Sequence, residues 1–342
     1  MNFGVPFVRL LGVAAFWVCL YGFCAAAGED AVRGRPAPPV RQAPPDGPGG
    51  RPGERPDGAR MWPEVRAVRD LAYVPDGHER QKLDIYLPKE AAPDAKLPVI
   101  VWVHGGAWRG GSKEQCPAVW FVRRGYAVAS IGYRLSQHAI FPAQLEDCKA
   151  AIRYLRANAG TYGLNPDRFG VWGSSAGGHL AASLGTTGDV KDFDKGPNLE
   201  FSSRVQVVCD FFGPSDFTKM ADFESRIDHN APDAPEALLV GGPVQEKKDE
   251  CRRANPVTYV TKDDPPFLIV HGDKDPIVPF NQSELLRDAL SRAGVDVRFH
   301  AVKDGGHGFR DKEVDRMVLE FFDKHLQPQA PTPAPSEDKP GK

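Results

Sequence analysis

The residues best suited to chemistry in this chain are Gly173-Ser174-Ser175-Ala176-Gly177, directly after the apolar run 169–172. An apolar strand that breaks at Gly-x-Ser-x-Gly and continues as a helix is typical of a nucleophile elbow. Glycines at both ends of the turn remove Cβ atoms that would collide with the neighbouring strand or helix. The pattern predicts that Ser175 Oγ stands above a sheet, at the positive end of a helix, where it can act as a nucleophile.

A serine hydroxyl is a weak nucleophile that needs a base, and the base needs a carboxylate to orient it. Asp275 and His307 each follow an apolar run, 266–270 and 297–302, in a polar loop. Loops at the carboxyl ends of strands are where open α/β sheets hold their sites. The order serine, acid, histidine is the one that accompanies this elbow, so we predict the triad Ser175, Asp275 and His307.

The chain has nine histidines, so the general base has to be chosen among several candidates. His307 has glycines on both sides of a loop that follows a strand, which lets its imidazole reach over a serine. His179 lies one helical turn beyond Ser175 and is interpreted as a packing residue. His271 and His300 lie at or within strands and are interpreted as structural.

The choice of acid is more open. Asp275 fits the pattern His-Gly-x-x-Asp-x-x-Val-Pro, and Asp273 is interpreted as holding the turn. Asp210 and Asp216, near the end of another strand, remain alternatives because the acid occupies that strand in some enzymes with this elbow.

Acyl transfer also needs hydrogen-bond donors for the oxyanion of the tetrahedral intermediate. The apolar run 97–103 ends in His104-Gly105-Gly106-Ala107-Trp108, whose small residues let backbone N–H groups approach a substrate. We predict an oxyanion hole formed by the N–H groups of Gly106, Ala107 and Ala176. Trp108 and Tyr133 are candidate substrate-binding residues, with core packing an equal alternative for Tyr133.

Further motifs accompany the elbow. They are Leu83-Asp84-Ile85-Tyr86, His104 to Lys113, Tyr133-Arg134-Leu135, Phe141 to Asp147, Asn165-Pro166-Asp167-Arg168, Gly173 to His179, and the loops around Asp275 and His307. With them, the chain from about Leu83 to Phe322 resembles the α/β-hydrolase superfamily. More narrowly, it is similar to secreted esterases and lipase-like proteins related to bacterial feruloyl and acetyl-xylan esterases. The resemblance implies two-step hydrolysis of carboxylic esters, with acetyl or feruloyl esters of plant polysaccharide as substrates. Ala107, where lipases carry glycine, leaves the acyl preference open.

Two other functions remain as alternatives. A serine peptidase of the prolyl-oligopeptidase type shares the elbow and loops, but such peptidases usually carry a propeller domain, for which we find no matching segment. A non-catalytic binding module on the same fold typically lacks a triad residue, and all three candidates occur here.

The apolar runs indicate the fold independently of the motifs. The predicted strands are 65–73, 83–87, 99–103, 127–131, 169–172, 205–211, 267–270 and 297–302. The predicted helices are 142–158, 176–184, 282–293 and 312–325. Alternating strands and helices predict an α/β fold with a mainly parallel, doubly covered sheet of eight strands. The first two strands have no helix between them, so we expect an antiparallel N-terminal edge.

The two ends of the chain differ in composition from the middle. Residues 1–27 have an arginine, an apolar stretch and three alanines, the layout of a secretory signal peptide. Residues 28–60 are rich in Pro, Gly and Arg, and residues 327–342 in Pro, so both are expected to be disordered. The catalytic domain is therefore predicted at 61–326 in a secreted or periplasmic protein, with an N-terminal membrane anchor as the alternative and cleavage of the signal open.

The net charge and the motifs limit the classes of partner that the sequence predicts. A formal net charge of −2 argues against nucleic-acid binding. The chain shows no phosphate loop, dinucleotide motif or metal-ligand cluster, so we expect no cofactor and no metal. The expected partner is an ester, free or attached to polysaccharide, with no stable membrane insertion after signal cleavage. The pairing of Cys116, Cys148, Cys209 and Cys251 cannot be read from their spacing.

Overall fold

The computed structural model of the chain describes residues 62–92 and 94–327. It contains one eight-stranded sheet with the order β1-β2-β4-β3-β5-β6-β7-β8. The strands are β1 Val65–Ala72, β2 Lys82–Pro88, β3 Leu97–Val103, β4 Ala127–Ile131, β5 Leu164–Ser174, β6 Val207–Phe211, β7 Phe267–Gly272 and β8 Val297–Val302. β2 pairs antiparallel with β1 and with β4, and every other pair is parallel. The predicted mainly parallel sheet with an antiparallel N-terminal edge is confirmed.

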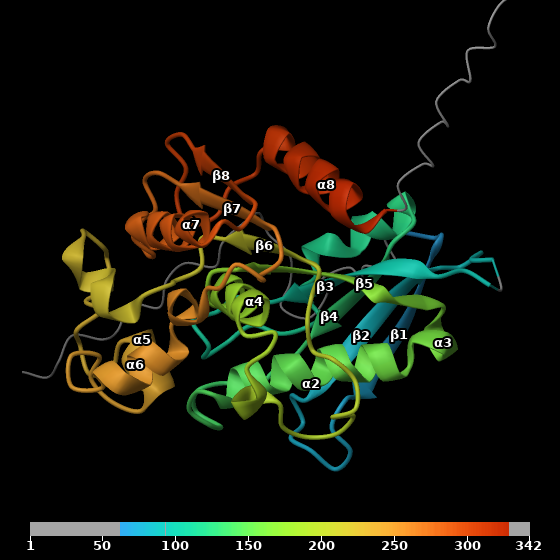
Figure 1. Cartoon of the computed structure of the whole chain (residues 1–342), viewed down its shortest axis with the longest axis horizontal. Helices are drawn as coiled ribbons and strands as arrows, with labels where there is room; N and C mark the ends of the chain where they lie inside the picture. Colours follow the sequence, from blue (N-terminus) through green and yellow to red (C-terminus); the bar gives the residue numbers. More distant parts are fainter. Residues whose placement is uncertain (1–61, 93, 328–342) are drawn as a thin grey trace, which may run out of the picture. The chain divides into compact units, whose positions relative to one another are not determined.

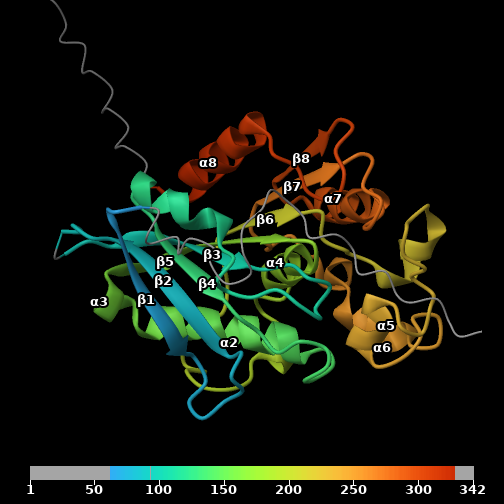
Figure 2. The ribbon, with the colours of Figure 1, turned by 180° about the vertical axis from the view of Figure 1, so that it is seen from behind.

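Helices cover both faces of this sheet. The α-helices are α2 Ala143–Ala157, α3 Ala159–Tyr162, α4 Ala176–Thr186, α5 Pro235–Val240, α6 Lys248–Ala254, α7 Asn281–Ala293 and α8 Lys312–Leu326. The 3-10 helices are η1 Pro117–Arg124, η2 Lys191–Phe193, η3 Phe217–Asp222 and η4 Pro256–Tyr259. One apolar core lies between the sheet and α2, α4 and α7, and a second lies between the sheet and η1 and α8. Figures 1 and 2 show α2 and α8 on opposite sides of the strands.

The central strand β3 shows why the sheet is buried on both faces. Val99, Val101 and Val103 belong to the first core, and Ile100 and Trp102 belong to the second. Successive side chains of a strand point to opposite faces, so a strand between two helical layers must be apolar throughout. This double burial explains the continuous apolar runs from which the parallel strands were predicted.

The segment between β6 and β7 differs most from the sequence-based expectation, which assigned no element there. It holds η3, α5, α6 and η4, and Figure 1 shows α5 and α6 beyond the ends of the strands. Each helix has only four to seven residues. Such short helices do not display a clear apolar period, and they are stabilised by packing against the rest of the fold.

Several predictions concern the ends of the chain. The predicted signal peptide, the linker and all of the tail except Gln327 lie outside the described residues. Within 62–92 and 94–327, no helix has the length and apolar character needed to cross a membrane. Across the same residues, Cys116, Cys148, Cys209 and Cys251 all carry free thiols.

Candidate active site

The turn between β5 and α4 holds Ser175 in an unusual backbone conformation, with φ 56° and ψ −124°. The Ser175 N–H donates to the carbonyl oxygen of Phe211 in the neighbouring strand (2.8 Å). A Cβ at Gly173 would overlap the carbonyl oxygen of Gly177, and one at Gly177 would overlap that of Val103. The two glycines therefore permit the sharp turn, and β6 holds the serine in place.

Ser175, His307 and Asp275 lie in one hydrogen-bonded row. His307 Nε2 is 3.0 Å from Ser175 Oγ, and His307 Nδ1 is 2.7 Å from Asp275 Oδ2. The three residues come from the β5–α4 turn and from the loops after β7 and β8. Because Asp275 accepts at Nδ1, the Nε2 lone pair of a neutral His307 faces the serine hydroxyl, the arrangement a general base requires.

The carboxylate of Asp275 is held from both sides. Its Oδ1 accepts from the backbone N–H groups of Ile277 (2.8 Å) and Val278 (3.0 Å). Its Oδ2 accepts from His307 and lies 3.2 Å from His271 Nε2. Burial raises the pKa of Asp275, but the hydrogen bonds with the two histidines, the attraction of the His307 imidazole and the Ile277 N–H together outweigh burial and hold the pKa well below its usual range. The carboxylate therefore stays ionised across the neutral range.

The other candidate acids lie elsewhere. Asp273 is exposed. Asp216 accepts from the Asn255 side chain (2.8 Å) and from the N–H of Thr218 (3.1 Å) at the start of η3. Asp210 is fully buried, and its Oδ1 accepts from the Gly213 N–H (3.0 Å). The hydrogen-bond partners of Asp210 and Asp216, and the exposure of Asp273, therefore differ from those of Asp275.

The segment after β3 carries the predicted oxyanion donors. Gly106, Ala107 and Trp108 have successive positive φ values of 112°, 55° and 54°. The Gly106 carbonyl accepts from the N–H groups of Arg109 and Gly110, both at 2.9 Å. This tight turn leaves Gly106 exposed and Ala107 partly exposed, and the N–H of Ala176 lies in the first turn of α4, where helix donors have no partner within the helix.

The two candidate substrate-binding residues do not lie on an open surface. Trp108 is 1% exposed, and its Nε1–H donates to His179 Nδ1 (3.3 Å). Tyr133 is fully buried, and its hydroxyl donates to the carbonyl oxygen of His104 (2.9 Å). Trp108 therefore differs from the expectation of cleft lining, whereas Tyr133 follows its core-packing alternative. The polar group of each side chain contacts a residue close in the chain to the predicted oxyanion donors.

Two buried histidines contact these two side chains without carrying charge. His104 stacks on Tyr133 with ring centroids 4.3 Å apart, and His179 also faces the carbonyl oxygen of Ala254 through Nε2 (2.8 Å). Burial lowers the pKa of each imidazole to about 4. Both rings are thus neutral near pH 7, which agrees with the packing role expected for His179.

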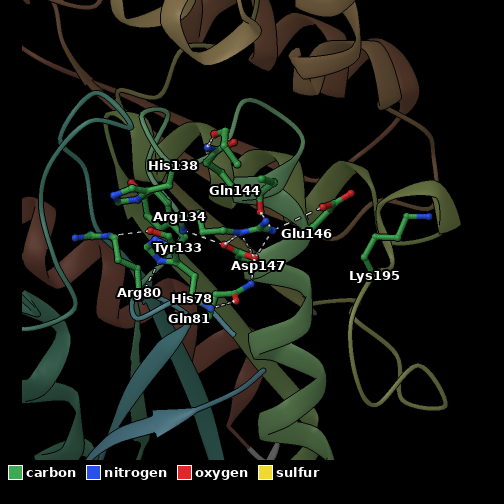
Figure 3. Close-up of polar contacts among 12 residues, drawn as sticks. His78, Arg80, Gln81, Tyr133, Arg134, His138, Gln144, Glu146, Asp147 and Lys195 are labelled. Carbon is green, nitrogen blue, oxygen red and sulfur yellow. Dashed lines mark hydrogen bonds and ion pairs between the residues drawn. The ribbon is translucent and has the colours of Figure 1, made fainter. Parts of the chain in front are cut away.

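A polar network joins the residues just before β2 to Tyr133 and, through Arg134, to α2; Figure 3 shows Arg80 beside Tyr133 and Arg134 against Asp147. Arg80 donates to the carbonyl oxygens of Gly111 (2.7 Å) and Tyr133 (3.0 Å). Arg134 donates to both oxygens of Asp147 in α2, at 2.8 and 2.9 Å. No local sequence signal marks Arg80, because its acceptors are backbone carbonyls far along the chain.

Sequence reasoning also missed an aromatic residue beside the triad. Phe212 directly follows β6, has φ 43°, and places its ring 4.7 Å from the imidazole of His307, centroid to centroid. Its N–H donates to the carbonyl oxygen of Val270 (2.9 Å). A bulky residue with positive φ is strained, and such strain gathers at functional sites. Its position at a strand end was the signal available in the sequence.

The buried carboxyl of Asp210, next to α4, is expected to make the free energy of unfolding depend on pH. Its Oδ2 has no hydrogen-bond partner, and burial raises its pKa to about 7. Between about pH 3.8 and 7 the folded state keeps a proton that the unfolded state has lost, so the free energy of unfolding falls as pH rises through this range.

Asp210→Asn cannot ionise, so we expect it to lose about 3 kcal/mol less stability than the wild type between pH 5 and pH 8. Urea unfolding at both pH values measures the difference, in which the other titrating groups cancel. Equal losses in the two proteins would show that Asp210 is ionised in the folded state at pH 5.

Comparisons with known proteins identify the family of the chain. The BD-FAE family model matches residues 83–290. Esterase LipQ of Mycobacterium tuberculosis is 31% identical over 266 residues, which cover 74% of this chain and 61% of that protein. The chain therefore matches about three fifths of the length of this relative.

Solved structures show the same fold. A truncated form of a carbohydrate esterase from gut microbiota has a TM-score of 0.70 and 36% identity, covering 76% of this chain and 95% of that one. An acetyl ester-xyloside bifunctional hydrolase from Caldicellulosiruptor lactoaceticus has a TM-score of 0.58 and 26% identity, covering 71% and 85%. Since the family model matches well over half of the sequence and the sheet agrees with these esterase structures, the chain belongs to the BD-FAE family and has the α/β-hydrolase fold.

Proposed function

We propose that this protein is a serine carboxylesterase that acts through an acyl-enzyme on Ser175. The observation that carries the proposal is the row Ser175 Oγ, His307 Nε2, His307 Nδ1 and Asp275 Oδ2, with contacts of 3.0 and 2.7 Å. Family membership supports it, because esterases are among both the relatives and the similar structures.

In the acylation step, Ser175 Oγ attacks the ester carbonyl carbon while His307 Nε2 takes the hydroxyl proton. The carbonyl electron pair moves to oxygen, and the N–H groups of Gly106, Ala107 and Ala176 donate to that oxyanion. Each such donor contributes on the order of 3 kcal/mol to transition-state stabilisation. His307 then gives the proton to the leaving alkoxide, the ester C–O bond breaks, and the alcohol departs.

Deacylation repeats these proton transfers with water. His307 Nε2 takes a proton from water, whose oxygen attacks the acyl carbon, and returns it to Ser175 Oγ as the acid leaves. Asp275 stays ionised throughout and stabilises the imidazolium that forms twice per turnover.

For the substrate, we propose acetyl or feruloyl esters of plant polysaccharide. The similar structures include a carbohydrate esterase and an acetyl ester-xyloside hydrolase. A cavity of about 250 Å³ is lined by Arg109, Ser136, Gln137 and Leu238, and Arg109 directly follows Trp108 in the chain. Its three polar side chains suit the hydroxyl groups of a sugar.

A substrate panel tests this proposal. We expect hydrolysis of p-nitrophenyl acetate and release of acetate from acetylated xylan or of ferulate from methyl ferulate. Cleavage of a peptide p-nitroanilide at a higher kcat/KM than any ester would favour the peptidase alternative. Absence of turnover on every substrate, with no labelling by a fluorophosphonate, would favour a binding module.

Export from the cytoplasm is part of the proposal. It rests on the composition of residues 1–27 and on the polysaccharide substrates proposed above, which lie outside cells. Cell fractionation, with N-terminal sequencing of the mature protein, tests it.

A further inference from the structure

A second histidine, besides His307, contacts the carboxylate of Asp275. His271 lies in β7 and is fully buried, with its Nε2 3.2 Å from Asp275 Oδ2 and 3.0 Å from the carbonyl oxygen of Val278. Its Nδ1 is 2.7 Å from the hydroxyl oxygen of Ser283 in α7. The polar row at the site therefore has five members, Ser283, His271, Asp275, His307 and Ser175.

These neighbours decide which nitrogen of His271 carries the proton. A backbone carbonyl and an ionised carboxylate only accept hydrogen bonds, so the Nε2 that faces both of them must carry hydrogen. The Nδ1 of a neutral ring then has a free lone pair and accepts from the Ser283 hydroxyl. Every polar atom of this buried ring is thereby satisfied by a single tautomer.

We propose that His271 is a positioning residue of the esterase, holding the carboxylate of Asp275 in the orientation that His307 needs. The inference rests on the proposed function. Three donors besides His307 then fix the carboxylate, namely the N–H groups of Ile277 and Val278 on Oδ1 and His271 on Oδ2. With its rotation blocked, Oδ2 stays aimed at His307 Nδ1.

The bond also shares the negative charge of Oδ2 between two imidazoles. Without it, the carboxylate attracts the imidazolium form of His307 more strongly, so His307 needs a higher pH to become a base. The other titratable groups on the loops that carry the triad include Asp273, Lys303 and the ion pair of Lys274 with Asp304, all exposed, and the carboxyl of Asp210 lies buried near the end of β6. None of these changes when His271 is replaced.

The test compares three variants of the full chain. His271→Leu removes the donor, and we expect kcat to fall about 10- to 100-fold with KM within about threefold, and the acidic limb of kcat/KM to move up by about half a pH unit. His271→Gln keeps an amide N–H near the Nε2 position, so its limb should return to that of the wild type with most of the activity. Ile269→Ala shortens another buried side chain of β7 and should lower stability without moving the limb.

A wild-type limb in His271→Leu, or no rescue by His271→Gln, would overturn the inference. If His271→Leu fails to fold, ¹⁵N-labelled histidine in the wild type decides by NMR, since the inference requires the Nε2–H tautomer and an Nδ1–H tautomer contradicts it. Failure of the proposed function is separate, because it would appear as ester hydrolysis that persists in Ser175→Ala.

Discussion

Replacing Ser175 with alanine is expected to lower kcat for ester hydrolysis by on the order of 10⁴-fold or more. The substitution removes the Oγ that lies 3.0 Å from His307 Nε2 and would form the acyl bond. The fold should persist, because alanine also has a Cβ and adds no strain at φ 56° beyond that of serine. Initial rates with p-nitrophenyl acetate and thermal unfolding measure the two effects.

The adjacent Ser174 offers a matched control, since it has the same side chain one residue away in β5. Ser174→Ala should keep the wild-type rate within a few-fold, and a fluorophosphonate should label Ser175 alone. Retention of a tenth of the wild-type activity in Ser175→Ala, with the fold intact, would rule out the serine mechanism.

Asp275→Asn is expected to lower kcat by about 10⁴-fold. Two backbone N–H groups, of Ile277 and Val278, face Oδ1 and can only donate, whereas the imidazoles that face Oδ2 can change tautomer, so the carbonyl oxygen of the new amide will take the Oδ1 side. Its NH₂ group then faces His307 and can only donate. This forces His307 Nδ1 to accept and moves its hydrogen to Nε2, which can no longer take the serine proton. Steady-state kinetics at pH 8 measure the loss.

Asp273→Asn provides the comparison, because Asp273 is exposed and lies two residues before Asp275. We expect a change of less than about threefold, in the range usual for surface sites. A large loss in Asp273→Asn together with a small one in Asp275→Asn would mean that a different carboxylate orients His307.

The sequence alone was sufficient to predict the sheet, for a physical reason. Strands covered by helices on both faces must be apolar along their whole length, so the runs that became β3, β4, β6 and β7 stand out from the polar loops. The same regularity makes the loops after β7 and β8 conspicuous, and it directs attention to Asp275 and His307. The elbow is also visible as a local sequence pattern, although only the contact at Gly173, with the carbonyl oxygen of Gly177, is local; Gly177 is required by the carbonyl oxygen of Val103 in β3.

Tertiary structure decided the features that depend on which distant residues meet. Trp108 and Tyr133 are residue types that often line clefts, but here their polar groups have partners in the core. Trp108 donates to His179, and Tyr133 donates to the carbonyl oxygen of His104. Neither Phe212 against His307 nor Arg80 against Gly111 follows a periodic pattern, because each contact joins segments far apart in the chain. The place of His271 at the end of a strand predicts a structural role and nothing more specific. Its contact with Asp275 arises from the turn that follows the strand, and its proton position follows from Val278 and Ser283 around it. Apolar periodicity thus determined the scaffold, whereas hydrogen-bond partners brought together by the fold determined how each polar side chain of the site is held.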